Sequence, residues 1–154
     1  MKKKKKKGYF LPINFKSKWI SYQQKEAKQW RFETRYGNDL AQAYRLYTLA
    51  LAAAPDLSSM NRLRETKGIS NESRLRLASA YVLAGQKSAG LNLLLKTTID
   101  DNSDYNYYYY GSADRNRAMA LETLLLLGQK QKAFAMAIKL AKEMSSDQWM
   151  STQT

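Results

Sequence analysis

The segment 100–111 holds the densest group of residues in the chain whose types and spacing suggest chemistry. Asp100, Asn102 and Asp104 occupy the first, third and fifth places of a calcium-binding loop, in which alternate side chains supply oxygen ligands. The pattern then fails, because Tyr105 stands where the loop needs a glycine and Gly111 where it needs a bidentate glutamate. The sequence therefore predicts no metal site in this segment.

The same segment carries a run of aromatic rings. The run consists of Tyr105, Tyr107, Tyr108, Tyr109 and Tyr110. Each ring offers an apolar face and a hydroxyl group, so the run is a candidate contact loop that could stack on sugars or bases. We favour the alternative, a structural loop whose alternate tyrosines pack on the ends of neighbouring helices.

Catalytic groups are scarce elsewhere in the chain. It contains no cysteine and no histidine, which excludes disulfides, cysteine nucleophiles, histidine bases and the usual zinc sites within it. The glutamates and aspartates are scattered, with no partner base and no glycine-rich phosphate loop beside them. No Ser-x-x-Lys element opens a helix. We therefore expect neither an enzyme nor a bound cofactor.

The formal net charge of +13 is concentrated at one end of the chain. Lys2–Lys7 supply six of these charges and leave +7 for the remainder, where Lys and Arg are interspersed with Glu and Gln. This favours a solvated helical surface over a nucleic-acid site. We interpret residues 1–8 as a disordered or artificial start and residues 9–154 as one domain. The apolar residues after the lysines are too few for a signal peptide, and no run of about 18 apolar residues predicts a membrane span.

The elements that would position any site are predicted to be helices. The chain has 44% hydrophobic residues and only two prolines, and its apolar residues recur at helical spacing in seven stretches. The predicted buried stripes are, in chain order, Phe15, Trp19, Tyr22 and Trp30; Leu40, Ala43, Tyr44, Tyr47 and Leu51; Leu57, Met60 and Leu63; Leu75, Ala78 and Val82; Leu91, Leu94 and Leu95; Ala118, Leu121 and Leu125; and Ala133, Met136, Ala137, Leu140, Ala141 and Met144. The two tryptophans of the first stripe could form a ligand platform, but we favour core packing.

Repeats connect these helices into hairpins. Gly85 and Gly128 are predicted to end helices, Gly128 in the left-handed region, and Ser70 or Asn71 to cap one. Residues 84–87, Ala-Gly-Gln-Lys, recur 43 residues later as Leu-Gly-Gln-Lys, and a second match of residues 54–63 to 85–94 has a spacing of 31. Hairpins of this kind must stack on neighbours to bury their faces. We expect an all-α fold of about seven helices, arranged as an arc of repeated hairpins in an open solenoid or a closed toroid.

The stretch 112–154 resembles the later part of the thioester-bearing helical domain of the bacterial alpha-2-macroglobulin family. In that family, a hairpin contains Arg and Leu at regular spacing, ends its first helix in Leu-Gly and continues with Lys-Ala-x-x-x-Ala. It leads into a Trp-x-Ser-Thr-Gln segment. The matching residues are Arg115, Ala118, Leu121, Leu124, Leu127, Gly128, Lys132, Ala133, Ala137, Trp149, Ser151, Thr152 and Gln153. Residues 44–61 are similar to family members of the Bacteroides type, so the resemblance covers most of the chain from about Gly8 onward.

The resemblance implies an α/α toroid of six hairpins in two concentric rings. It also implies a parent protein that traps proteases through an internal Cys–Gln thioester and that is anchored to the inner membrane in the periplasm. This chain has no cysteine, and Gln153 belongs to the Ser-Thr-Gln segment, so no thioester forms within it. The role implied for the chain is therefore that of a scaffold fragment of a protease inhibitor.

The partners implied are the other domains of the parent, proteases bound by the parent, and other copies through exposed toroid edges. The alternative is a free-standing basic helical-repeat module that binds nucleic acid or an acidic protein, with Lys2–Lys7 as an electrostatic arm. A tetratricopeptide-like receptor is disfavoured, because spacings of 31 and 43 do not hold a period of about 34 residues.

Overall fold

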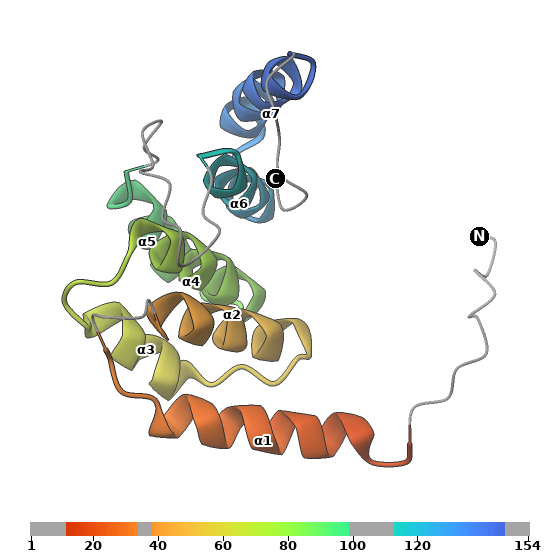
Figure 1. Ribbon diagram of the computed structural model, residues 1–154, viewed down its shortest axis with the longest axis vertical. Coiled ribbons are helices and arrows are strands. Elements are labelled where there is room, and N and C mark those ends of the chain that lie inside the picture. Colours follow the sequence, from red (N-terminus) through yellow and green to blue (C-terminus); the bar gives the residue numbers. More distant parts are fainter. Residues whose placement is uncertain (1–11, 34–37, 99–112, 147–154) are drawn as a thin grey trace.

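The structure, a computed structural model, describes residues 12–33, 38–98 and 113–146. These residues form helices and no strand, which confirms the all-helical prediction (Figure 1). The helices are α1 (Phe15–Gln29), α2 (Asn38–Leu51), α3 (Leu57–Glu65), α4 (Asn71–Leu83), α5 (Lys87–Leu95), α6 (Ala113–Leu126) and α7 (Lys130–Met144). The predicted contact loop and the Trp149–Gln153 signature lie outside the described residues.

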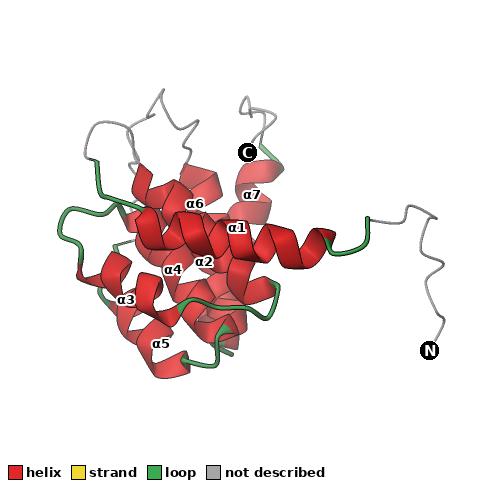
Figure 2. Cartoon of the chain, turned by 90° about the horizontal axis from the view of Figure 1, so that it is seen from below, coloured by secondary structure: helices red, strands yellow, loops and turns green. Residues whose placement is uncertain are grey.

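The pairs α2–α3, α4–α5 and α6–α7 follow one another along the long axis of the molecule, with α1 at one end and α7 at the other (Figure 1). Helices α2, α4 and α6 pack against one another in succession, and each pairs with the helix that follows it. Helix α1 covers α2 at its end of the array, as the view from that end shows (Figure 2). The described part of the chain is therefore three stacked hairpins with one additional covering helix.

The three hairpins share one turn. In each, a residue with positive φ follows the first helix, namely Ala53 (60°), Gly85 (79°) and Gly128 (74°). The amide of the next residue bonds back across the turn, from Ala54, Gln86 and Gln129 to the carbonyls of Leu49, Tyr81 and Leu124, at 2.9, 2.8 and 2.9 Å. This is the Schellman ending of a helix. The left-handed conformation predicted for Gly128 is confirmed, and Gly85, predicted as a helix end, adopts it as well.

The main core lies among α2, α3 and α4. It contains Leu46, Leu49, Met60, Leu63 and Leu77, all fully buried. Trp19 and Trp30 pack against this core, as the favoured interpretation of the two tryptophans predicted. A smaller cluster joins α6 to α4 through Leu75, Met119 and Ala120.

In several predicted core stripes, some residues are exposed. Tyr22 and Leu51 are 58% and 56% exposed, and Leu125 of α6 is 59% exposed. The reason is the same in each case: spacing reveals that a helix has an apolar face but not which neighbour covers it. In α6 the residues buried against the rest of the molecule are instead Asn116, Arg117, Met119, Ala120, Thr123 and Leu124.

Candidate functional site

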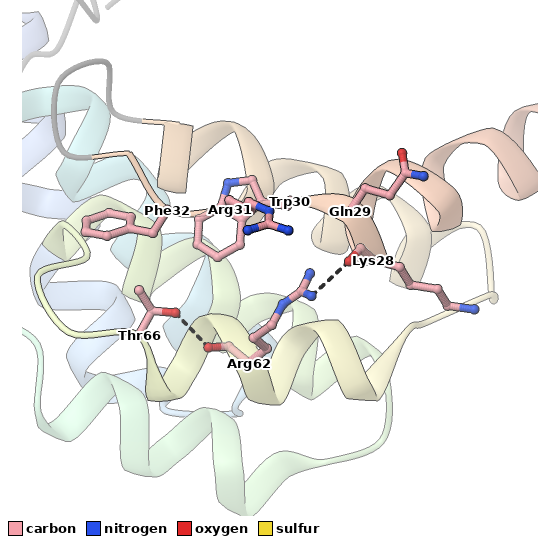
Figure 3. Close-up of a pocket in the computed structure, with 7 residues that line it drawn as sticks. All are labelled: Lys28, Gln29, Trp30, Arg31, Phe32, Arg62 and Thr66. Carbon is pink, nitrogen blue, oxygen red and sulfur yellow. Dashed lines mark hydrogen bonds between the residues drawn. The ribbon is translucent and has the colours of Figure 1, made fainter.

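A groove lined by basic and aromatic side chains lies where the end of α1 meets α3 (Figure 3). We call it the basic groove. It has a volume of about 880 Å³ and is lined by Lys28, Gln29, Trp30, Arg31, Phe32, Arg62 and Thr66. Three of these residues are cations and none is an acid, so the groove favours anionic groups.

Arg62 fixes the position of α3 against the end of α1. Its guanidinium donates to the carbonyls of Lys28, at 2.8 Å, and Ala27, at 2.5 Å. The last carbonyls of a helix lack partners within it and lie at the negative end of its dipole, so a cation is well placed there. Arg62 therefore acts mainly as a cap, and the charges left to attract a ligand are those of Lys28 and Arg31.

The aromatic wall of the groove is held by Asn38. The indole of Trp30 donates to the backbone carbonyl of Asn38 at 3.2 Å, and the side-chain amide of Asn38 donates to the backbone carbonyl of Arg31 at 2.7 Å. The ring of Phe32 lies 6.2 Å from that of Trp30, tilted by 52°. A planar or apolar group entering the groove would meet a wall that is already in place.

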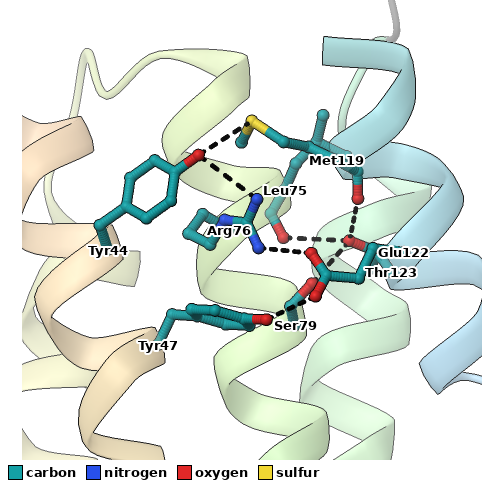
Figure 4. A network of polar contacts seen from close by, with 8 residues as sticks. All are labelled: Tyr44, Tyr47, Leu75, Arg76, Ser79, Met119, Glu122 and Thr123. Atoms are coloured by element: carbon teal, nitrogen blue, oxygen red, sulfur yellow. Dashed lines mark hydrogen bonds and ion pairs between the residues drawn. The ribbon is translucent and has the colours of Figure 1, made fainter. Parts of the chain in front are cut away.

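A second constellation is a partly buried polar cluster between α2, α4 and α6 (Figure 4). The guanidinium of Arg76 lies between the rings of Tyr44 and Tyr47, 4.6 and 4.4 Å from their centroids. It pairs with the Glu122 carboxylate at 2.5 Å, and the Tyr47 hydroxyl donates to the same carboxylate. Burial and the bond to Glu122 raise the pKa of Tyr47. We call these four residues the Arg76 cluster, and it ties three helices together.

Asp39 forms the third polar centre, at the start of α2. It is 4% exposed, and one of its oxygens accepts from the Ser70 amide at 2.7 Å and from the hydroxyls of Ser70 and Ser73 at 2.8 and 2.7 Å. Burial raises the pKa of Asp39, but these hydrogen bonds outweigh it and hold the pKa below its usual value. Ser70 is also the N-cap of α4, as predicted, so Asp39 orders the start of that helix.

An apolar groove of about 290 Å³ separates α5 from α7. It is lined by Leu91, Leu94, Leu95, Leu124, Gln129, Lys132 and Met136. Its lining is mainly leucine and methionine, with Gln129 and Lys132 as the polar members.

Sequence reasoning missed most of these residues. The sequence carried one signal for the basic groove, the alternation of aromatic and basic residues at positions 30–32, at the end of the first predicted helix. Nothing in the sequence marks Arg62, Arg76 or Asp39, because these residues find their partners 29 to 46 residues away in the chain. The residues named in advance, Tyr105 to Tyr110 and Trp149 to Gln153, are not placed by the structure.

Metal-binding clusters and membrane-spanning helices are both absent from the described residues. Within residues 12–33, 38–98 and 113–146, no three acidic side chains come together in a way that would hold a metal ion. None of the helices in the described part of the chain has the length and apolar character of a membrane span. Comparisons with protein-family models, with curated proteins and with solved structures gave no match to this chain.

Proposed function

We propose that this chain is a scaffold segment from the helical domain of an alpha-2-macroglobulin-like protease inhibitor. Its stacked hairpins would form an arc of the α/α toroid, and the protease-trapping thioester would belong to another part of the parent. The observation that carries the proposal is the shared hairpin turn at Ala53, Gly85 and Gly128, which gives three units one geometry. The sequence resemblance at residues 112–154 supplies the family.

The arrangement of polar groups supports a structural role. The side chains of the Arg76 cluster and of Asp39 bond to residues of neighbouring helices. Buried polar groups used in this way fix how neighbouring units stack, which is what a toroid arc requires. In the parent, such an arc would sit in the periplasm and contact neighbouring domains.

The size of the native polypeptide tests this proposal. An antibody raised against residues 30–63 would be used for an immunoblot of the source cells. We expect a band far larger than the 17.7 kDa of this chain. A band near 17.7 kDa would contradict the scaffold proposal and leave an independent module.

The basic groove favours a second candidate, a module that binds nucleic acid or an acidic protein. Lys28 and Arg31 stand beside the rings of Trp30 and Phe32, and this pairing of cations with stacking surfaces suits single-stranded nucleic acid. The same charges would also attract an acidic peptide, so the shared requirement is negative charge.

A charge-reversal experiment tests the second candidate. Fluorescence anisotropy would measure binding of single-stranded DNA to the chain without Lys2–Lys7, with and without Lys28→Glu and Arg31→Glu. The matched control is Lys16→Glu with Lys18→Glu, which makes the same charge change on exposed residues near the other end of α1. Groove binding predicts loss of affinity in the first pair only. An equal loss in both pairs, or no binding without the lysine run, would exclude the groove as a site.

A further inference from the structure

Residues 30–33, directly after α1, form an extended segment beside the basic groove. Trp30 has φ −56° and ψ 136°, and no residue of the segment belongs to a helix. The side chains of Trp30 and Phe32 are partly buried against the main core. Those of Arg31 and Glu33, which alternate with them, are exposed. This alternation is that of a β-strand with one buried face, and we call residues 30–33 the edge segment.

The side chain of Asn38 occupies one edge of this segment. Its amide nitrogen donates to the backbone carbonyl of Arg31 at 2.7 Å, and its amide oxygen accepts from the backbone amide of Glu33 at 3.1 Å. In a parallel sheet, a residue of the neighbouring strand makes the same two bonds, one on each side of the residue that it faces. The carboxamide of Asn38 therefore takes the place of a strand partner, centred on Phe32.

The other edge of the segment is open at Phe32. In an extended chain, the N–H and C=O of one residue point to one edge, and those of its two neighbours point to the opposite edge. The N–H and C=O of Phe32 therefore point away from Asn38, and among the residues that the structure describes nothing bonds to either group. An open N–H and C=O pair on an extended segment is a template for pairing with another extended chain.

The charges around the edge segment select for an acidic chain. Lys28 and Arg31 line the basic groove, and neither forms an ion pair with another described residue. Arg62 adds a third positive charge, although its N–H groups donate to carbonyls at the end of α1 (Figure 3). No acidic residue lines the groove. Carboxylates that enter it would meet positive charge without a competing acid.

The aromatic rings of the groove favour a peptide over a nucleic acid. The rings of Trp30 and Phe32 pack against the main core and are tilted by 52° to each other. The Phe32 ring also lies beside Gly68, 3.6 Å from the place of a Cβ atom on that residue. Base stacking needs an open ring face, and a phosphodiester backbone has no N–H group to donate to the Phe32 carbonyl.

We propose that the basic groove binds an acidic peptide in extended conformation. The main chain of the peptide pairs with the N–H and C=O of Phe32, and its carboxylates lie beside Lys28 and Arg31. Main-chain bonds supply affinity in this mode of recognition, and the two cations select acidic side chains. The inference rests on the second candidate function and names the class of its ligand.

Two probes of equal charge test the inference. Fluorescence anisotropy at physiological salt would measure binding of the full chain to labelled, end-capped hexaglutamate and to an oligothymidylate of the same net charge. We expect the peptide to bind more tightly, and Lys28→Glu with Arg31→Glu to weaken its binding about tenfold or more. The matched control, Lys16→Glu with Lys18→Glu near the other end of α1, should change the affinity much less.

An ester analogue isolates the main-chain bonds. An oligomer of the corresponding hydroxy acid keeps the carboxylates of hexaglutamate but has no N–H donors. We expect it to bind about two- to tenfold more weakly than the peptide. In hydrogen-exchange NMR, hexaglutamate should slow exchange of the Phe32 amide. Exchange of the Glu33 amide, which is already bonded to Asn38, should stay nearly unchanged.

Each contrary result has a distinct meaning. Equal binding of the ester analogue, or an unchanged Phe32 amide, overturns the inference and leaves the second candidate function in place. Tighter binding of the oligothymidylate that is lost on reversal of Lys28 and Arg31 identifies nucleic acid as the ligand and also overturns the inference alone. Equal weakening by the control pair, or no binding of either probe, rejects the groove as a site and the second candidate function with it.

Discussion

At the scale of single residues, the Arg76 cluster concentrates the contacts between three hairpins. Arg76 is 7% exposed and comes from α4, while its partners come from α2 and α6. Its guanidinium has the two tyrosine rings on its faces and the Glu122 carboxylate at one edge. Removing this one side chain would therefore loosen contacts on both sides of α4.

We expect Arg76→Ala to lower the free energy of unfolding by about 2 kcal/mol, measured by urea denaturation. The loss is smaller than for a fully buried pair, because the Glu122 side chain is 40% exposed and water can solvate it. Arg76→Met should lose less, since it keeps the stem between the rings. The control is Arg64→Ala, which removes an exposed pair with Glu65 and should cost at most about 1 kcal/mol. Equal losses for Arg76→Ala and Arg64→Ala would contradict the cluster's role.

Asp39 makes a prediction about pH. Its pKa is lower in the folded chain than in the unfolded chain, so the unfolded chain binds more protons as the pH falls through this range. The stabilisation by Asp39 is complete above the unfolded pKa of about 4 and is lost as the pH falls through the folded pKa. We expect Asp39→Asn to be less stable than the native chain at pH 7, and the difference to shrink toward pH 3. A stability difference that stays constant from pH 7 to pH 3 would show that the Asp39 charge is not the cause.

At the scale of elements, the hairpin turns were readable in the sequence and the directions of the helical faces were not. Gly85 and Gly128 mark helix ends in the sequence, because few other residues adopt the left-handed conformation at low energetic cost. Of the three hairpin turns, only the turn at Ala53 has no glycine. The stripe of Ala118, Leu121 and Leu125 was recognised as apolar but expected to be buried. Burial depends on whether a neighbouring element covers the stripe, and periodicity carries no information about that.

The polar cluster around Arg76 could not be predicted from the sequence, because it too depends on which elements come together in the fold. Arg76 is the kind of residue that is usually exposed, and only the approach of Tyr44, Tyr47 and Glu122 makes its burial favourable. Those partners lie 29 to 46 positions away, so no local pattern connects them. The basic groove was partly accessible, through the order of residues 30–32, but Arg62 was not.

The α4–α5 hairpin depends on a close approach at Gly90. A Cβ atom added there would stand 2.7 Å from Val82 Cγ2 and 2.8 Å from the carbonyl oxygen of Ala78. Alanine would gain about 1 kcal/mol in helix propensity, but overpacking of this kind costs typically 1–3 kcal/mol, and the backbone oxygen cannot rotate away. We expect Gly90→Ala to lower the melting temperature, measured by circular dichroism. The control is Ser88→Ala, which changes an exposed residue of the same helix and should be neutral or slightly stabilising. If the Gly90→Ala chain were as stable as this control, α5 would be able to move away from α4 without cost.

At the scale of the whole molecule, burial is distributed unevenly along the stack. Helix α4 lies at its centre, with neighbours on several sides, and most of its residues from Ser73 to Val82 are buried. Helix α7 lies at the open end, and Ala133 is its buried residue. In a stacked array each unit is stabilised by its nearest neighbours, so an end unit with one neighbour opens more easily than a central unit.

This asymmetry predicts a gradient of hydrogen exchange, with the amides of α4 exchanging slowest and those of α7 fastest.

Two substitutions separate local opening from global unfolding. Leu77→Ala removes a fully buried side chain from the main core, should cost about 2–5 kcal/mol, and should speed exchange throughout the described helices. Ala133→Gly should cost about 1 kcal/mol and speed exchange in α6 and α7 while leaving α4 nearly unchanged. If Ala133→Gly instead accelerated exchange in α4 as much as in α7, the stack would unfold as one cooperative unit, and the open end would be held by more than its single buried alanine.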